Sequence, residues 1–234
     1  MKIKYYYIIP VVIIGLTSFI GGLTGAFKIY KLGSPSMEPR YTSGDYIIGT
    51  NLILPELNDI IYFKSESLRI PGVREAKTEL KVGRLVGLSN DKIELKDGKC
   101  YRNGEMIDRE EDLKFAYETS IALFKKSGIE KEIVSTDIIT NIYMEKAILF
   151  LDNLKYERYK EELMLEKINM EFGAFLEESP IMNQIDKTWT WLNYGPIEVP
   201  EGHFFYLGDN RMNAEDSRIL GSIPIENIRG VVIN

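Results

Sequence analysis

The chain has 234 residues, a length that favours one or two domains. Hydrophobic residues make up 44% and charged residues 27%, an ordinary composition for a globular protein. The net charge is −6 and no long basic block occurs, which argues against a nucleic-acid surface because phosphate binding needs clustered Lys and Arg. The single cysteine and single histidine exclude an intramolecular disulfide framework and a zinc site with several such ligands, and we expect no metal or cofactor.

The N-terminal segment from Tyr5 to Phe27 contains no charged residue. As a helix these residues would span roughly 35 Å, enough to cross a hydrocarbon core of about 30 Å. A cleaved signal peptide is the alternative, but its apolar part is usually only about 7–15 residues long. We therefore predict a single-pass membrane anchor within residues 1–30. It would place the rest of the chain on the extracellular face of the cell membrane.

Residues 32–108 and 179–234 have the pattern of a β-rich domain. Tyr46–Ile48 and Ile60–Phe63 are short apolar runs that end in turn residues. Asp97-Gly98 and Asn103-Gly104 are strong signals for two-residue hairpin turns. A last short strand is expected between Ile228 and Ile233.

Residues 109–178 differ from both flanks. They are rich in Glu, Lys, Leu, Met and Ala, and they contain no proline. Ile138, Ile142 and Leu149 recur at roughly helical spacing, and Ser135-Thr136-Asp137 is typical of a helix start. We therefore predict a helical insertion of two or more helices, which would serve as a surface cap on the sheet or as a partner-binding surface.

Ser36 is a candidate nucleophile close to the end of the predicted anchor. A serine hydroxyl is a weak nucleophile that needs a base, and acyl transfer also needs hydrogen-bond donors for the oxyanion. In an extended segment Ser34 and Ser36 point the same way, so the Ser34 hydroxyl could join the Ser36 backbone N–H in holding an oxyanion. Without further context, such serines are most often turn residues.

The context is a series of segments that resembles one known family, the bacterial type I signal peptidases. Ser34–Pro39 followed by Gly44-Asp45 resembles the nucleophile box of these enzymes, and Asn58–Phe63 is similar to their next strand. Further matches, in chain order, are Arg84–Leu88 with Asp91, Tyr194–Pro196, Val199–Gly202, Gly208–Arg211 and Asp216–Arg218. The last two segments are the most specific, and the insertion at 109–178 lies outside the resemblance.

The resemblance implies a mainly β fold of two antiparallel sheets with a helical insertion and one N-terminal transmembrane helix. It also implies a serine endopeptidase with a Ser/Lys dyad that cuts signal peptides from exported proteins. By that match, Ser36 is the nucleophile and Ser34 is the oxyanion-hole hydroxyl. Asp216 and Arg218 would form a supporting ion pair behind the site.

Two departures from the family pattern concern the general base. The lysine that this family uses would stand immediately before Arg84, where this chain has Gly83, and the serine that hydrogen-bonds it is replaced by Ala214. Lys81 is a substitute candidate, because it lies two residues from Gly83 and so projects from the same face of the strand; the alternative is an exposed strand lysine. His203 follows a turn, where the family carries a strand residue without a catalytic role.

The sequence therefore leaves two functions open. The first is a membrane-anchored serine endopeptidase of the signal peptidase type, with Lys81 as its base. The second is a catalytically impaired relative that keeps the family's extended-peptide groove and binds pilins or other exported proteins during surface-pilus assembly. In both readings the partners are exported pre-proteins or pilin subunits and the membrane.

Overall fold

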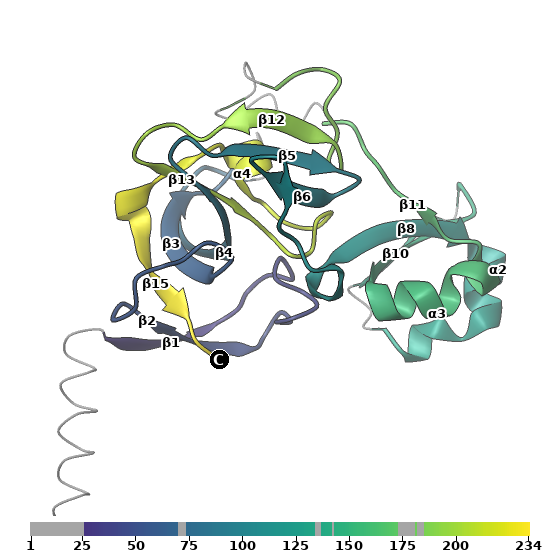
Figure 1. The fold of residues 1–234 in the computed structure, drawn as a ribbon. Helices are drawn as coiled ribbons and strands as arrows, with labels where there is room; N and C mark the ends of the chain where they lie inside the picture. Colours follow the sequence, from purple (N-terminus) through teal and green to yellow (C-terminus); the bar gives the residue numbers. More distant parts are fainter. Residues whose placement is uncertain (1–25, 70–73, 134–136, 142, 173–180, 182–184) are drawn as a thin grey trace, which may run out of the picture.

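The computed structural model describes residues 26–69, 74–133, 137–141, 143–172, 181 and 185–234. Its largest unit is a curled seven-stranded sheet (Figure 1). Neighbouring strands of this sheet are, in order, β1 (Phe27–Lys31), β2 (Tyr46–Thr50), β15 (Ile228–Val232), β3 (Ile60–Glu66), β4 (Thr78–Leu88), β13 (His203–Leu207) and β14 (Ile223–Pro224). Each of these neighbouring strand pairs is antiparallel, as the family resemblance implies.

A second antiparallel sheet, here called the hairpin sheet, packs against the first and contains the two predicted hairpin turns. Its strands are β12 (Tyr194–Glu198), β5 (Lys92–Lys96), β6 (Lys99–Arg102) and β7 (Glu105–Met106). Asp97-Gly98 connects β5 to β6, and Asn103-Gly104 connects β6 to β7. All four of these residues have positive φ, which is the backbone geometry that two-residue hairpin turns favour. The prediction of both hairpins is confirmed.

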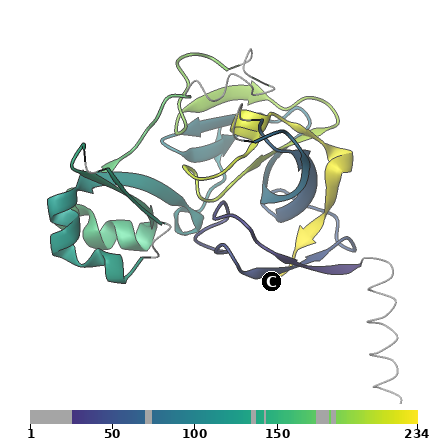
Figure 2. The same ribbon diagram turned by 180° about the vertical axis from the view of Figure 1, so that it is seen from behind.

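The segment inserted between the two halves of this β-rich part forms a lobe of its own beside the sheets (Figures 1 and 2). Its described residues form a four-stranded antiparallel sheet and two α-helices. The strands are β11 (Glu166–Lys167), β8 (Lys114–Ser120), β10 (Lys146–Asp152) and β9 (Ile138–Asn141), and the helices are α2 (Ile121–Ser127) and α3 (Asn153–Leu163). The two predicted helices are present, but the four-stranded sheet that they accompany was not predicted.

The error has a physical cause in the central strands of the insertion. In β10 the side chains of Ala147, Leu149 and Leu151 are 0% exposed on one face, and Phe150 on the other face is also buried, so the strand lies in the core. Leu149 of β10 pairs with Ile138 of β9. Residues whose spacing along the chain suggests a helix are thus neighbours on two adjacent strands. Asp137 likewise precedes a strand and not a helix. Local composition is a weak prior that such tertiary pairing overrides.

Hydrophobic packing joins the insertion to the seven-stranded sheet. One cluster of buried side chains contains Phe63 and Tyr206 of that sheet together with Tyr117 and Leu149 of the insertion. A second cluster, around Val86 and Ile93, fills the space between the seven-stranded sheet and the hairpin sheet. Short 3₁₀ turns at Glu110–Asp112, Ile129–Lys131 and Ile225–Asn227, and a four-residue helix α4 (Ser217–Leu220), complete the described elements.

The predicted membrane anchor falls mostly on residues 1–25, which lie outside the described residues. At its end, residues 27–31 form the strand β1 and not a helix. Within the described part of the chain, no helix combines the length and the apolar character that a membrane span requires.

Candidate functional site

The loop that carries Ser36 connects β1 to β2 and forms a compact turn, here called the nucleophile loop (residues 32–41). The Glu38 amide donates to the Pro35 carbonyl at 3.1 Å, and the Tyr41 amide donates to the Met37 carbonyl at 3.1 Å. Met37 is only 1% exposed and packs into a small apolar cluster with Leu32 and Ile47. A buried side chain next to Ser36 thus fixes the loop while the serine side remains accessible.

The structure brings the two predicted serine hydroxyls together. Ser34 Oγ lies 3.1 Å from Ser36 Oγ, so either hydroxyl can donate to the other. Ser34 is exposed and Ser36 is half-buried. The two hydroxyls therefore share one side of the loop, as the extended Ser34–Ser36 segment predicts, and their roles as oxyanion donor and nucleophile stay predictions.

The segment after β13 holds the nucleophile loop from the other side. The Asn210 amide donates to the Ser36 carbonyl at 3.0 Å, and its side-chain Nδ2 donates to the Pro35 carbonyl at 3.3 Å. At Gly208 an added Cβ would lie 2.8 Å from the Ser36 carbonyl oxygen and 2.3 Å from the Ala214 Cβ. Glycine is therefore the residue that allows Ser36 and Ala214 to approach the same backbone.

Gly83 lies in β4, which pairs with β13, the strand that ends just before Gly208. Arg84 is opposite Leu207 in the antiparallel pairing of β4 with β13, so the register runs from Gly83 toward Gly208. The Ser36 carbonyl and the Ala214 side chain thus both lie at Gly208, and the strand register leads from Gly83 to the same glycine; the roles assigned to these positions stay predictions.

The space beside Gly83 is filled by an aromatic ring that sequence reasoning did not single out. A Cβ added at Gly83 would lie 2.5 Å from Cδ2 of Tyr206. Tyr206 is only 2% exposed, and its hydroxyl donates to the Glu215 carbonyl at 3.0 Å. Burial raises the pKa of Tyr206 well above its ordinary value of 10.0, so the phenol stays neutral and does not act as a base near neutral pH.

Lys81, the predicted substitute base, reaches toward the same region but ends in an ion pair. Its Nζ donates to Glu215 Oε2 at 2.5 Å and lies 3.9 Å from Glu79 Oε2. Glu215 also accepts from the Leu68 amide at 2.9 Å and from Arg74. Burial acts to raise the pKa of Glu215, but these hydrogen bonds outweigh it, and the pKa lies below its ordinary value of 4.5. The carboxylate of Glu215 therefore stays ionised and holds the Lys81 side chain in an ion pair.

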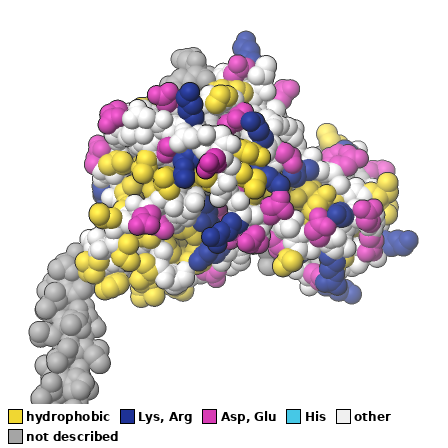
Figure 3. Space-filling view, viewed as in Figure 1, with side chains coloured by type: hydrophobic (Ala, Val, Ile, Leu, Met, Phe, Trp, Pro, Cys, Tyr) yellow, Lys and Arg dark blue, Asp and Glu magenta, His cyan; other side chains and the backbone are white. Residues whose placement is uncertain are grey.

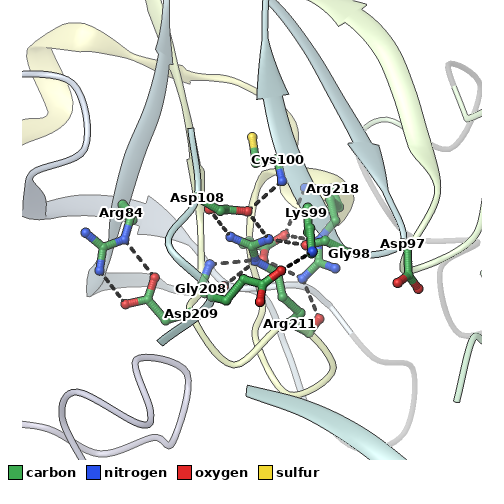
Figure 4. Close-up of polar contacts among 12 residues, drawn as sticks. Arg84, Asp97, Gly98, Lys99, Cys100, Asp108, Gly208, Asp209, Arg211 and Arg218 are labelled. Atoms are coloured by element: carbon green, nitrogen blue, oxygen red, sulfur yellow. Dashed lines mark hydrogen bonds and ion pairs between the residues drawn. The ribbon is translucent and has the colours of Figure 1, made fainter. Parts of the chain in front are cut away.

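Three arginine–aspartate pairs form a frame behind the nucleophile loop, and Figure 4 shows most of their members. Arg84 holds Asp209 through two hydrogen bonds of 2.8 and 2.7 Å. Arg211 holds Asp108 in the same way at 2.6 and 2.7 Å. Arg218 holds Asp216 at 2.9 and 2.7 Å. Such bidentate, charge-assisted pairs fix orientation as well as distance.

The frame connects directly to the residues around Ser36. Asp216 Oδ2 accepts from the Gly208 amide at 3.1 Å, and Arg218 donates to the Arg211 carbonyl at 2.7 Å. Asp216 and Arg218 thus pair as predicted, and their supporting role remains a prediction. The sequence does not identify Asp108 as a functional residue, because its partner Arg211 is distant in the chain. Arg211 lies in one of the motif segments, but the sequence assigns it no role.

A polar pocket of about 260 Å³ lies beside the frame. Its lining includes Arg40 of the nucleophile loop, Arg84 of the frame, and Asp59, Arg109 and Asp112. Among the residues that the structure describes, no three His, Cys, Asp or Glu side chains converge as a set of metal ligands.

Comparison with known proteins gives a consistent family assignment. The family model described as "Signal peptidase, peptidase S26" matches residues 4–233. Signal peptidase I of Rickettsia typhi is 30% identical over 177 residues, which cover 75% of this chain and 50% of that protein. Signal peptidase I of Buchnera aphidicola is 25% identical over 229 residues, which cover 87% of this chain and 66% of that protein. The chain thus spans about half to two thirds of the length of these relatives.

Among solved structures, a signal peptidase I from Enterococcus faecalis V583 is similar at 21% sequence identity and a TM-score of 0.34. The match covers 78% of this chain and 100% of that chain.

Proposed function

Since the chain belongs to the signal peptidase family, peptidase S26, we propose that it binds exported pre-proteins beside Ser34 and Ser36 without efficient hydrolysis. The observation that carries this proposal is the Tyr206 ring at the place where the family's lysine would begin. The partners would be exported pre-proteins, with pilin subunits as one class of them. The site would lie on the extracellular face of the cell membrane.

The argument against efficient hydrolysis rests on the proton of Ser36. A general base typically contributes about 10²–10⁴-fold to such a reaction, and a serine hydroxyl without one is a poor nucleophile. Tyr206 is a neutral phenol, and Lys81 is occupied by a carboxylate. Neither group offers a free base to the hydroxyl in this arrangement.

The argument for retained binding rests on the loop itself. An extended peptide is recognised chiefly through backbone hydrogen bonds and side-chain pockets, which require no base. The nucleophile loop keeps its compact turn, its anchoring Met37 and the adjacent Ser34 and Ser36 hydroxyls. The buried frame behind it is complete. A surface of this kind would hold a signal-peptide segment whether or not the bond is cut.

Photo-crosslinking tests the binding step directly. A pre-protein would carry a photoreactive side chain just before its cleavage site and be mixed with the purified full-length chain in detergent. We expect equal crosslinking to wild type and Ser36→Ala, and a strong decrease for Ser36→Trp, which would block the loop. The control Leu154→Trp changes an exposed side chain on α3 and should not alter crosslinking. Equal crosslinking of all four proteins would overturn the proposal.

A slow serine endopeptidase is the second candidate, and two observations favour it. The Ser34 and Ser36 hydroxyls lie 3.1 Å apart, and the Lys81 amine reaches Glu215, the residue next to Ala214. Loss of the Glu215 contact on substrate binding would free Lys81 as a base. This candidate predicts weak signal-peptide cleavage that disappears in both Ser36→Ala and Lys81→Met. Cleavage that persists in Lys81→Met would exclude that role for the lysine.

Membrane attachment is part of the proposal, and the surface near β1 supports it. Large apolar side chains are exposed on β1, on β2 and in the loop that follows β2; they are Phe27, Ile29, Tyr46, Ile48, Leu52, Ile53 and Leu54. Apolar side chains gather at this end of the molecule (Figure 3). An exposed apolar patch of this kind marks an interaction surface, and a lipid surface fits it because β1 directly follows the proposed anchor in the sequence.

A further inference from the structure

A buried lysine of the insertion contacts the nucleophile loop. Lys114 is the first residue of β8 and is 5% exposed. Its Nζ lies 2.5 Å from Oε2 of Glu38, which is two residues after Ser36, and 2.7 Å from Oδ2 of Asp137. Glu38 and Asp137 are also buried. One ammonium thus joins a carboxylate of the nucleophile loop to a carboxylate of the insertion.

The backbone of the same residue contacts the segment after β13. The Lys114 amide donates to the Asp209 carbonyl at 3.1 Å, and the Arg211 amide donates to the Lys114 carbonyl at 3.0 Å. Between them, the Asn210 amide donates to the Ser36 carbonyl. Lys114 therefore holds the neighbourhood of Ser36 by two routes, through its ammonium to Glu38 and through its backbone to the residues that flank Asn210.

The charges explain why the ammonium matters for the shape of the loop. Two buried carboxylates share one cation, and within the described part of the chain neither has another ion-pair partner, so removal of the cation would leave both without a counter-charge. Removing one partner of a buried ion pair is strongly destabilising, because the remaining charge is neither solvated nor paired. Glu38 would respond by moving toward solvent, and Ser36 would move with it.

We propose that Lys114 is a positioning residue that holds the Ser36 loop in its peptide-binding shape and makes the insertion part of the site. This inference rests on the proposed function, because the peptide is the ligand for which the loop is shaped. It assigns the insertion a role at the site, beyond that of a surface cap.

Hydrogen exchange of the full-length chain, purified in detergent, tests the positioning role without any peptide. In Lys114→Met, amide exchange within residues 34–41 should increase at least about tenfold, because the turn loses its buried counter-charge. The matched control is Lys146→Met, since Lys146 pairs with Glu118 at the same 2.5 Å within the insertion sheet and does not contact the loop. Exchange in residues 34–41 should be unchanged in that control.

General loss of stability must give a different pattern. Leu149→Ala removes a buried side chain from the insertion and should increase exchange in β8–β10 while residues 34–41 stay protected. In the double variant Lys114→Met/Glu38→Gln the unpaired charge of Glu38 is also removed. Its loop amides should therefore exchange more slowly than those of Lys114→Met alone. The inference is overturned if Lys114→Met leaves loop exchange unchanged, or if Leu149→Ala at matched stability increases it equally.

Peptide affinity then separates this inference from the proposed function. With a synthetic signal peptide as probe, Lys114→Met should raise the dissociation constant about tenfold or more, while Lys146→Met should leave it unchanged. If wild type does not bind the peptide, the proposed function fails, and the exchange result still decides the positioning role. If wild type binds and Lys114→Met binds equally well, the proposed function stands and the role of Lys114 in binding is wrong.

Discussion

At residue scale, the central contact is between Gly83 and Tyr206. The absence of a lysine at position 83 can be seen in the sequence, but the ring that occupies its place cannot, because Tyr206 follows Gly83 by more than a hundred residues. The backbone of Gly83 is not in the left-handed region, so only the ring and not the local conformation opposes a side chain there. The missing side chain at Gly83 and the Tyr206 ring that occupies its place are therefore one structural feature, although the two residues are distant in the sequence.

This feature predicts a measurable coupling between the two positions. Gly83→Lys should lower the free energy of unfolding by about 1–3 kcal/mol, because the new side chain overlaps a packed ring. Gly83→Lys/Tyr206→Met should cost less than the sum of the two single changes, since the longer, flexible side chain of Met leaves room for the lysine stem. Urea unfolding of the four proteins measures the coupling, and strict additivity would show that the ring is not what excludes the lysine.

The ion pair of Lys81 with Glu215 predicts a pH dependence. The folded-state pKa of Glu215 lies below its ordinary value of 4.5, so its carboxylate contributes stability above that pH and loses the contribution as pH falls through the folded pKa. Wild type should therefore exceed Glu215→Gln in unfolding free energy near neutral pH. The difference should shrink as the pH falls below about 4.5. A difference that stays constant on acidification would contradict the paired carboxylate.

At element scale, the hairpins and the insertion show what local sequence can and cannot predict. Asp97-Gly98 and Asn103-Gly104 determine their own turns, because their side chains tolerate positive φ, and both hairpins are found. The insertion escapes prediction because β8 and β10 are identified by their partners across the sheet and not by their composition. Lys114 at the start of β8 escapes for the same reason, since both of its carboxylate partners lie far away in sequence.

The hairpin sheet provides a chemical probe of its own packing. Cys100 in β6 is fully buried, and burial raises the pKa of its thiol to about 12. Alkylation requires the thiolate, so the thiol should resist iodoacetamide in the native protein and react on unfolding. Mass spectrometry of native and urea-treated samples measures this. Rapid labelling of the native chain would mean that the β5–β6 hairpin opens readily.

At the scale of the whole molecule, apolar side chains are exposed together at the end that carries β1, β2 and the loop after β2 (Figure 3). Burying a leucine in an apolar medium contributes about 1.5–3 kcal/mol, so several of them would hold the domain against a bilayer. In the full-length chain reconstituted into vesicles, the amides of the loop around Leu54 should exchange more slowly than the amides of other exposed loops. Leu54→Glu should remove this protection.

A matched leucine serves as the control for lipid contact. Leu154 on α3 is 83% exposed and Leu54 is 86% exposed, but Leu154 belongs to the insertion. Leu154→Glu should leave the protection around Leu54 unchanged. Loss of protection in both variants, or in neither, would argue against a specific lipid-facing surface at this end of the molecule.

The most direct test of the account is signal-peptide release from a pre-protein with small residues before the cut. Wild type and Ser36→Ala should give the same background. Gly83→Lys/Ala214→Ser should remain near it, because Tyr206 still blocks the lysine, whereas Gly83→Lys/Tyr206→Met/Ala214→Ser should exceed it by about 10²-fold, the lower range for a restored base. Efficient release by wild type that disappears in Ser36→Ala would contradict the claim that this chain binds pre-proteins without hydrolysing them.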